Sequence, residues 1–506
     1  MRQVRKTFVA VVLVLALTTA ALAQDSVDAF DRYVEAARKE WKVPGLSVVV
    51  VMDGKVLLSK GYGIRELGKP DIVDNQTLFG AMSTTKAMTA VAMGILVDER
   101  KVDWDDKVTD HLPDFKIADP FVTSQLTVRD LFTHNSGLAS TDFLWSRTAE
   151  LPAEEAIRRM QYARPAYPLR GGFVYQNSMY LVAGKVIEKV SGMPWERFMT
   201  ERVFGPLGMK NTFPTLKSTE KYPNRTASHF EIKGTMQVIP EHNADTIAPA
   251  GAVWSTSDDM GIWVRFLLGY TTASGKPLLN AATMNELFRP QVILPATFYP
   301  TFRITKPKWT TYGLGWFQHD YRGEKVDFHT GSLAGRTAIV GLLRDKKVGV
   351  YVFGNLEHAE VRHALMYKVF DMFGFNDERG RDWSAEFKVL YDGITAESQK
   401  QAAAQMARRL PNSKPSLPLA SYAGRYSDPF YGTVEVQFAD GKLRLIAAKD
   451  LSAELDHRHI DTFHAIWSKP WLGEGLVTFQ LSPVNGDVVS LTTGGQTLRR
   501  VSQAAR

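Results

Sequence analysis

The sequence contains no cysteine among its 506 residues. Disulfide bonds, thiolate metal ligands and a cysteine nucleophile are therefore all excluded. The sequence also has no extended run of lysine and arginine with interleaved aromatic residues, which is the pattern typical of a nucleic-acid-binding surface. We therefore expect no nucleic-acid partner. We expect a large apolar core to stabilise the fold, since 44% of the residues are hydrophobic.

The apolar run near the N-terminus, residues 7–21, is shorter than the ~20 residues that a membrane-spanning helix needs. Basic residues precede this run, and the small-residue pattern Ala21-Leu22-Ala23 ends it. This arrangement predicts a secretory signal peptide over residues 1–23, cleaved near Ala23. We therefore expect a periplasmic or secreted protein with no stable membrane span after cleavage, and a retained N-terminal anchor is the alternative.

Residues 24–375 combine strand and helix patterns. Each end of this segment supplies a pair of strands, over residues 46–58 and 337–353, and each pair is accompanied by an amphipathic helix, over residues 25–41 and 357–373. The simplest assembly joins both strand pairs in one antiparallel sheet flanked by helices, while the helix-rich middle forms an all-helical lobe. The predicted fold class is therefore α/β (α+β), and a cleft between the lobes is the expected place for a site.

The character of the sequence changes after this segment. Residues 376–415 are predicted to form a helical connector that ends in a Pro/Ser-rich linker. Residues 416–506 contain short alternating segments separated by turns such as Asp440-Gly441. Strands at this spacing predict a small barrel or sandwich, and we favour a C-terminal β-barrel.

Ser83 and Lys86 stand at the start of a run, residues 83–96, that is small or apolar almost without a break. A helix apolar on every side lies in a protein interior, and residues three apart share one of its faces. Burial disfavours the charged form of a lysine and leaves a neutral amine that can take the proton of a neighbouring serine. The pair is therefore our candidate for a catalytic nucleophile and its base, although the S-x-x-K pattern taken alone fits an ordinary helix N-terminus better.

A second candidate is the stretch of residues 170–177, in which two glycines free the backbone and Tyr175 and Asn177 stand two apart. In an extended loop these two side chains project to the same side. A tyrosine beside a cationic lysine has a lowered pKa, which makes the Tyr175 phenolate a second candidate base for Ser83. The Asn177 amide can bind a substrate carbonyl, although the stretch taken alone fits a turn with one buried aromatic residue better.

The third candidate, His329-Thr330-Gly331-Ser332, directly precedes a predicted strand and is expected to lie on a sheet edge that lines the cleft. Gly331 lets a substrate backbone approach closely, and extended backbone here can pair with a peptide-like ligand. The amide N–H groups of Ser332 and Ser83 are the candidate oxyanion hole. Taken alone, the tripeptide His-Thr-Gly is more typical of a structural histidine in a turn than of a substrate-binding site.

Taken together, Ser-x-x-Lys at Ser83, Tyr-x-Asn at Tyr175 and His-Thr-Gly at His329 resemble the serine β-lactamase and penicillin-binding protein superfamily. The resemblance is closest to its class C-like branch, which has DD-peptidase, D-aminopeptidase and esterase relatives. It spans roughly residues 30–375 and extends to flanking stretches such as Leu126–Leu138. The C-terminal segment is similar to the lipocalin-like β-domains appended to some of these hydrolases.

The resemblance implies an acyl-enzyme on Ser83, proton handling by Lys86 and Tyr175, and no metal or cofactor. The implied function is that of an exported serine hydrolase acting on amides or esters, with small molecules or peptides containing D-amino acids as substrates. The alternatives are a penicillin-binding or peptidoglycan-sensing protein with little turnover, and a β-lactamase. His329 stands where class C β-lactamases usually have lysine, and the histidine form is more like the peptidases and esterases, so β-lactamase activity ranks lower. Nothing in the sequence indicates an oligomeric state.

Other residues also invite a functional interpretation. His457, His459 and His464 suggest a metal cluster, but without cysteine or a clear carboxylate ligand we favour a polar barrel surface. His134 lies beside Asn-Ser-Gly and is interpreted as a loop-stabilising residue rather than a base. Arg100 stands where relatives commonly end a helix with glycine, which leaves the end of the Ser83 helix open.

Overall fold

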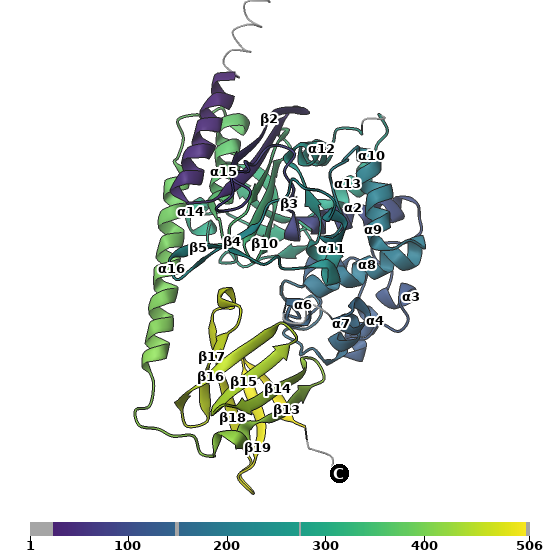
Figure 1. Ribbon diagram of the computed structural model, residues 1–506. Helices are drawn as coiled ribbons and strands as arrows, with labels where there is room; N and C mark the ends of the chain where they lie inside the picture. Colours follow the sequence, from purple (N-terminus) through teal and green to yellow (C-terminus); the bar gives the residue numbers. More distant parts are fainter. Residues whose placement is uncertain (1–23, 147–150, 273–274, 502–506) are drawn as a thin grey trace, which may run out of the picture.

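The computed structural model of the protein describes residues 24–146, 151–272 and 275–501 (Figure 1). The predicted signal peptide, residues 1–23, lies outside these ranges. Within them, no helix combines the length and the apolar character needed to cross a membrane.

An eight-stranded sheet forms the centre of the main domain. Its strands are β1 (Gly45–Met52), β2 (Lys55–Gly63), β7 (Val292–Ile293), β8 (Thr310–Tyr312), β9 (Phe317–Tyr321), β10 (Glu324–Leu333), β11 (Arg336–Leu343) and β12 (Val348–Gly354). They lie in the order β2-β1-β12-β11-β10-β9-β8-β7. β1 pairs antiparallel with β12, so the predicted joining of the first and last strand pairs in one antiparallel sheet is confirmed.

Helices cover both faces of this sheet. One face packs against the N-terminal helix of residues 24–40 and against α15 (Val361–Val369). The other packs against α2 (Thr85–Asp98) and α12 (Ser257–Leu267). Because successive side chains of a strand point to opposite faces, a strand covered on both sides is apolar along its length, and β1 is buried from Gly45 to Val51.

The middle of the chain forms a helix-rich lobe beside the sheet (Figure 1). α8 (Asn177–Ser191) and α2 are its central helices, and both are buried over most of their length. The other helices of the lobe are α3 (Val108–His111), α4 (Pro120–Gln125), α5 (Asp130–Thr133), α6 (Phe143–Ser146), α7 (Ala153–Arg159), α9 (Trp195–Phe198), α10 (Gly205–Leu207), α11 (Ala248–Gly251) and α13 (Ala281–Leu287). α14 (Phe302–Thr305) instead packs on the sheet face that α15 covers. Two-stranded sheets pair β3 (Phe79–Gly80) with β6 (Trp254–Ser255) and β4 (Ser228–Ile232) with β5 (Thr235–Ile239).

The last helices of the main domain depart from the predicted bounds. α15 begins at Val361 rather than near Glu357. α16 (Trp383–Ala407) follows, and its first turns pack on the main domain, where Trp383 Nε1 donates a hydrogen bond of 2.7 Å to Oδ2 of buried Asp371. The rest of α16 runs down to the C-terminal domain in Figure 1. The start of the predicted connector, residues 376–415, is thus packed into the main domain.

The C-terminal domain is a closed barrel of eight strands, as predicted. The strands are β13 (Gly424–Asp428), β14 (Gly432–Ala439), β15 (Lys442–Ala448), β16 (Leu451–His459), β17 (Thr462–Trp467), β18 (Glu474–Leu481), β19 (Val488–Thr493) and β20 (Gln496–Arg500). Arg458 of β16 ties the barrel to α16, because its guanidinium donates hydrogen bonds of 2.6 and 3.0 Å to the carbonyls of Gln405 and Met406. A cation at a helix C-terminus satisfies carbonyls that have no partner within the helix.

The turn between β13 and β14 reaches the main domain. Phe430 is only 4% exposed and belongs to the same apolar cluster as α2 and α8. The ring of Tyr431 meets that of Phe143 in α6 edge-on, with 5.0 Å between the ring centroids. The barrel therefore contributes to the core of the helical lobe and supports α6.

We predict that Phe430→Ala lowers the free energy of unfolding by about 3 kcal/mol, because it removes a buried ring from this core. Urea denaturation followed by circular dichroism measures the change. Phe438→Ala in β14 is the matched control, since its ring is 42% exposed and its loss should cost less than about 1 kcal/mol. Equal effects of the two substitutions would contradict the packing role of Phe430.

Candidate functional site

Ser83 lies at the start of the buried helix, as the sequence predicts. A short 3-10 turn at Met82–Thr84 carries it, and α2 continues directly from this turn. All α2 residues from Thr85 to Leu96 are buried, whereas Ser83 keeps partial exposure. Met82 has a φ of 46°, in the left-handed region that a bulky residue rarely adopts, so the backbone is strained next to Ser83.

Lys86 is fully buried beneath Ser83. Its Nζ lies 3.1 Å from Ser83 Oγ, and it donates hydrogen bonds of 2.6 Å to Asn177 Oδ1 and 2.9 Å to the carbonyl of Ala250. Burial lowers the pKa of Lys86 to about 7, while the nearby Asp142 carboxylate acts in the opposite direction.

These three contacts define what a neutral Lys86 can do. A neutral amine has two hydrogens and one lone pair. The carbonyl oxygens of Asn177 and Ala250 are acceptors only, so they take both hydrogens. The lone pair is then left for the Ser83 hydroxyl, which donates to it, and this is the arrangement of a nucleophile with its general base.

Tyr175 lies on the other side of Ser83. It lines the same cavity as Ser83, which acts on its pKa, and Lys86 Nζ lies 4.8 Å from the centroid of its ring. Burial raises the pKa of Tyr175 well above its ordinary value, which is opposite to the lowered pKa expected from the sequence. The reason is that burial also favours the uncharged form of Lys86, so near pH 7 the cation that was expected to lower the tyrosine pKa is present in only part of the molecules. These pKa shifts suit Tyr175 to donate a proton and Lys86 to accept one.

His134 holds the backbone on both sides of Tyr175. Its carbonyl accepts a hydrogen bond of 3.0 Å from the amide of Val174, and its Nδ1 accepts one of 2.9 Å from the amide of Gln176. Its ring lies against that of Tyr175, with 4.3 Å between the centroids. Burial keeps the pKa of His134 well below its ordinary value, so the ring is neutral. The geometry agrees with the interpretation of His134 as a loop-stabilising residue.

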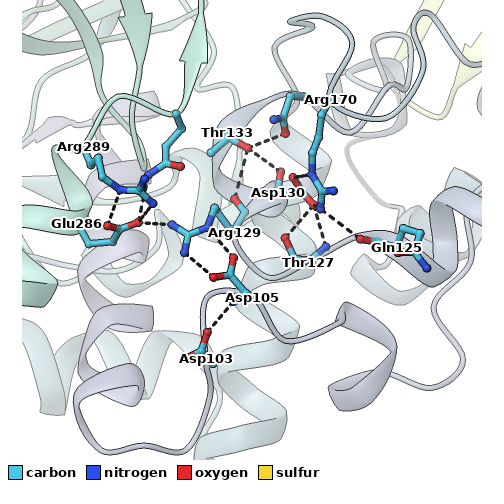
Figure 2. A network of polar contacts seen from close by, with 12 residues as sticks. Asp103, Asp105, Gln125, Thr127, Arg129, Asp130, Thr133, Arg170, Glu286 and Arg289 are labelled. Atoms are coloured by element: carbon cyan, nitrogen blue, oxygen red, sulfur yellow. Dashed lines mark hydrogen bonds and ion pairs between the residues drawn. The ribbon is translucent and has the colours of Figure 1, made fainter.

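A network of polar contacts fixes the other end of the Tyr175 loop (Figure 2). The guanidinium of Arg170 donates two hydrogen bonds, of 3.0 and 2.6 Å, to the carboxylate of buried Asp130. Asp130 also accepts from the amide and the hydroxyl of Thr127. Next to it, Arg129 at the start of α5 pairs with Asp105 and with Glu286 of α13, and so links these parts of the lobe. The loop that carries Tyr175 is thus anchored to the helical lobe at both ends.

The His329-Thr330-Gly331-Ser332 stretch lies near the end of β10. β10 pairs with β9 only as far as Phe328, so the edge from His329 onward is left without a strand partner on that side among the described strands. A Cβ on Gly331 would lie 2.4 Å from the carbonyl oxygen of Ala81 and 3.0 Å from the amide nitrogen of Ser83. Glycine is therefore required for β10 to lie directly against the nucleophile turn.

His329 is buried and neutral, because burial lowers its pKa to about 3. Both of its nitrogens are engaged. The tautomer follows from the partners. Nδ1 donates a hydrogen bond of 2.7 Å to the carbonyl of Thr330, and Nε2 accepts one of 3.1 Å from the hydroxyl of Tyr312. The Tyr312 hydroxyl in turn accepts a hydrogen bond of 3.1 Å from His134 Nε2, so Tyr312 links His134 and His329 behind the site.

Arg362 of α15 was not singled out from the sequence. Its guanidinium donates hydrogen bonds to the carbonyls of Gly331 and Ala338 and to the hydroxyl of Ser332, and it pairs with buried Glu360. Arg362 therefore holds the end of β10 from behind. The local feature that could have indicated this role is the presence of an arginine in a short helix whose residues are all buried.

Six of the eight predicted site residues line one cavity of about 340 Å³. They are Ser83, Tyr175, Asn177, His329, Thr330 and Ser332. Lys86 and Gly331 lie behind this surface and touch Ser83 from below and from the side. The cavity walls also contain Asp142, Trp145, Phe298 and Tyr299, which sequence reasoning missed. The eight predicted residues therefore come together from three separate segments of the chain.

Metal ligands are not grouped here or elsewhere in the described ranges, since no set of three or more histidine, aspartate and glutamate side chains there is arranged to hold an ion. In the barrel, His457 Nε2 bonds the carbonyl of Ile460, and His464 pairs with Glu474.

Comparison with known proteins agrees with this geometry. Residues 30–369 match the family described as "Beta-lactamase". The chain belongs to the beta-lactamase family. Members of this family are generally serine hydrolases, and the arrangement at Ser83 fits that chemistry. Residues 408–500 match a second family, described as "Domain of unknown function (DUF3471)", which covers the barrel.

Individual relatives are distant. The chain is 28% identical over 447 residues to Unguisins hydrolase ungD of Aspergillus violaceofuscus (strain CBS 115571), with 82% of this chain and 77% of that protein covered. Its fold is similar to that of the octameric penicillin-binding protein homologue from Pyrococcus abyssi, with a TM-score of 0.61, 21% identity and 93% and 99% of the two chains covered. A D-stereospecific amidohydrolase from Streptomyces sp. gives a TM-score of 0.55 at 21% identity, over 68% of this chain and 98% of that one.

We predict that kcat/KM for a p-nitrophenyl ester falls as the pH drops below about 7, since protonation of Lys86 removes the lone pair that faces Ser83. His329 titrates near pH 3 and cannot produce this limb. Tyr175→Phe should lower kcat/KM by roughly 10²- to 10⁴-fold and keep the limb, whereas Lys86→Ala should abolish it. A pH–rate profile between about pH 5 and 9 measures both effects. An acidic limb that survives in Lys86→Ala would assign the base to another group.

Proposed function

We propose that the protein is an exported serine hydrolase that cleaves amides or esters through an acyl-enzyme on Ser83. The observation that carries this proposal is the lone pair of a neutral Lys86 directed at the Ser83 hydroxyl, since its two hydrogens are taken by Asn177 and Ala250. The family membership supports the reaction class. The basic and apolar N-terminal segment supports export to the periplasm or the medium.

In the first step the Ser83 proton passes to Lys86 as Oγ attacks the substrate carbonyl. The amide N–H groups of Ser83 and Ser332 stabilise the tetrahedral oxyanion. Tyr175, protonated because of its raised pKa, donates its hydroxyl proton to the leaving nitrogen or oxygen and recovers one from Lys86. The carbon–heteroatom bond then breaks and leaves the acyl-enzyme. Water then gives a proton to neutral Lys86 as it attacks the carbonyl carbon of the acyl-enzyme. The bond between that carbon and Ser83 Oγ breaks, the proton passes from Lys86 to Oγ, and the acid leaves.

The proposed substrates are D-amino-acid peptides, amides or small esters. Neutral His329 supplies no fixed cation for the carboxylate that common β-lactams carry, and both of its nitrogens are already engaged. The names of relatives are consistent with amide substrates, since one is called a D-stereospecific amidohydrolase. Two alternative functions use the same nucleophile. A β-lactamase differs in its substrate, and a penicillin-binding or peptidoglycan-sensing protein with little turnover differs in its slow deacylation.

We predict that a fluorophosphonate probe adds once to the protein and that the adduct maps to Ser83. Intact-mass spectrometry followed by peptide mapping measures this. Ser83→Ala should lose both labelling and turnover while its circular dichroism spectrum stays the same, since Ser83 is partly exposed and its hydroxyl fills no core position. A label on another serine would refute the assignment. Penicillin that stays bound for hours without release would favour the binding protein.

A further prediction concerns His329. The wild-type protein should prefer D-alanyl p-nitroanilide or a p-nitrophenyl ester over nitrocefin, and His329→Lys should shift that ratio toward nitrocefin by several-fold. The reason is that a charge-assisted contact to the β-lactam carboxylate is stronger than a neutral hydrogen bond by on the order of 1 kcal/mol. Values of kcat/KM for the three substrates test it. Nitrocefin as the best wild-type substrate would contradict the specificity argument.

A further inference from the structure

Asp142, in the segment just before α6, is a charged residue in the cavity that the reaction outlined above leaves unused. Apart from it and neutral His329, no ionisable acid or base of the Asp, Glu, Lys, Arg or His type lines the cavity within the described residues. Its Oδ1 accepts hydrogen bonds of 2.8 Å from Asn177 Nδ2 and 3.0 Å from Trp145 Nε1. None of the described residues donates to its second oxygen, Oδ2. The carboxylate is thus fixed in place through Oδ1, and the described residues leave the accepting capacity of Oδ2 unused.

Among the described residues that line the cavity, none offers this carboxylate a permanent cation. Lys86 is separated from it by the Asn177 amide and is neutral above its pKa of about 7. The Arg362 guanidinium already donates hydrogen bonds to the carbonyls of Gly331 and Ala338. A carboxylate in a partly buried site is stabilised by a ligand that brings a positive charge, and it disfavours one that brings a negative charge.

The surrounding walls are also suited to a cation. Trp145, Phe298 and Tyr299 line the same cavity, and aromatic faces attract ammonium groups. The position is close to the chemistry, since Asp142 bonds to Asn177, Asn177 to Lys86, and Lys86 to Ser83. A group attached near the scissile carbonyl is therefore the part of a substrate that meets Asp142.

We propose that Asp142 binds the free ammonium group of the substrate's acyl residue. This inference rests on the proposed function, in which the acyl group is that of a D-amino acid. It makes the protein selective for unblocked amino ends, as an aminopeptidase or amino-acid amidase is. A carboxypeptidase would instead need a cation for the terminal carboxylate of its substrate, and the described walls of the cavity supply none.

Three anilides that share a 3-phenylpropionyl skeleton and differ in charge test this. They are D-phenylalanine p-nitroanilide, 3-phenylpropionyl p-nitroanilide and N-succinyl-D-phenylalanine p-nitroanilide, assayed at pH 7, where most α-amino groups are still protonated. The wild-type kcat/KM should be about tenfold or more higher for the cationic than for the neutral substrate, and lowest for the anionic one. In Asp142→Asn the ratio between cationic and neutral substrates should fall to about one, since only the charge is lost.

Asp142→Asn keeps an oxygen that can accept from Asn177 and Trp145, so the wall of the cavity is preserved. Asp53→Asn is the matched control, because it removes one carboxylate from the β1–β2 turn outside the cavity and should keep the wild-type ratio. If Asp142 only positioned Asn177, its replacement would slow all three substrates by the same factor and leave the ratio unchanged, which would overturn the inference. A wild-type preference for the neutral or anionic substrate would overturn it as well.

Failure of the proposed function looks different. In that case Ser83→Ala does not abolish hydrolysis of the anilides or of a p-nitrophenyl ester. There is then no Ser83-dependent activity for which kcat/KM of the cationic and neutral substrates could be compared. Ester hydrolysis that depends on Ser83, without any preference for the ammonium substrate, would keep the serine hydrolase and refute the role of Asp142.

Discussion

The burial of Lys86 is the constraint on which the rest of the site depends. Moving an ammonium group out of water is costly, so the amine becomes neutral near pH 7 and its hydrogens need acceptors inside the protein. Asn177 at the start of α8 and Ala250 in α11 supply them. α2 must therefore be enclosed on every side by other segments, and its uninterrupted apolar character serves the chemistry of Ser83 as well as the core.

The enclosure also determines how the reactive groups meet. Ser83 follows Met82, which is held in the left-handed region, and such a residue costs on the order of 1–3 kcal/mol unless its surroundings enforce the conformation. The close approach of Gly331 to this turn is one such constraint. Tyr175 comes from a loop that His134 and the Arg170–Asp130 pair fix at two points. The nucleophile is thus positioned by elements from the sheet and the helical lobe at once.

The sequence predicted the parts of this arrangement that are local. Ser83 and Lys86 share a helix face, and turn residues separate the strands of the barrel. Gly331 was expected to admit a substrate backbone, whereas in the structure its missing Cβ makes room for the turn that carries Ser83. Contacts across the lobes leave no such pattern, and for that reason Asp142, Trp145 and Tyr299 were missed. The direction of the Tyr175 pKa was wrong for a related reason: the argument placed a charged lysine beside the ring, whereas the same burial that brings the two together neutralises the lysine.

The pKa of Lys86 reflects a balance of two opposing effects, burial lowering it and Asp142 raising it. A bound ammonium group would oppose the field of Asp142 and move Lys86 further toward the neutral form. Recognition of a positively charged substrate would then also favour the base that the reaction requires. The wall that carries Asp142 continues into α6, and α6 packs on the β13–β14 turn of the barrel through Phe143 and Tyr431. The C-terminal domain therefore contacts the helix that follows this carboxylate, even though none of its described residues lines the cavity.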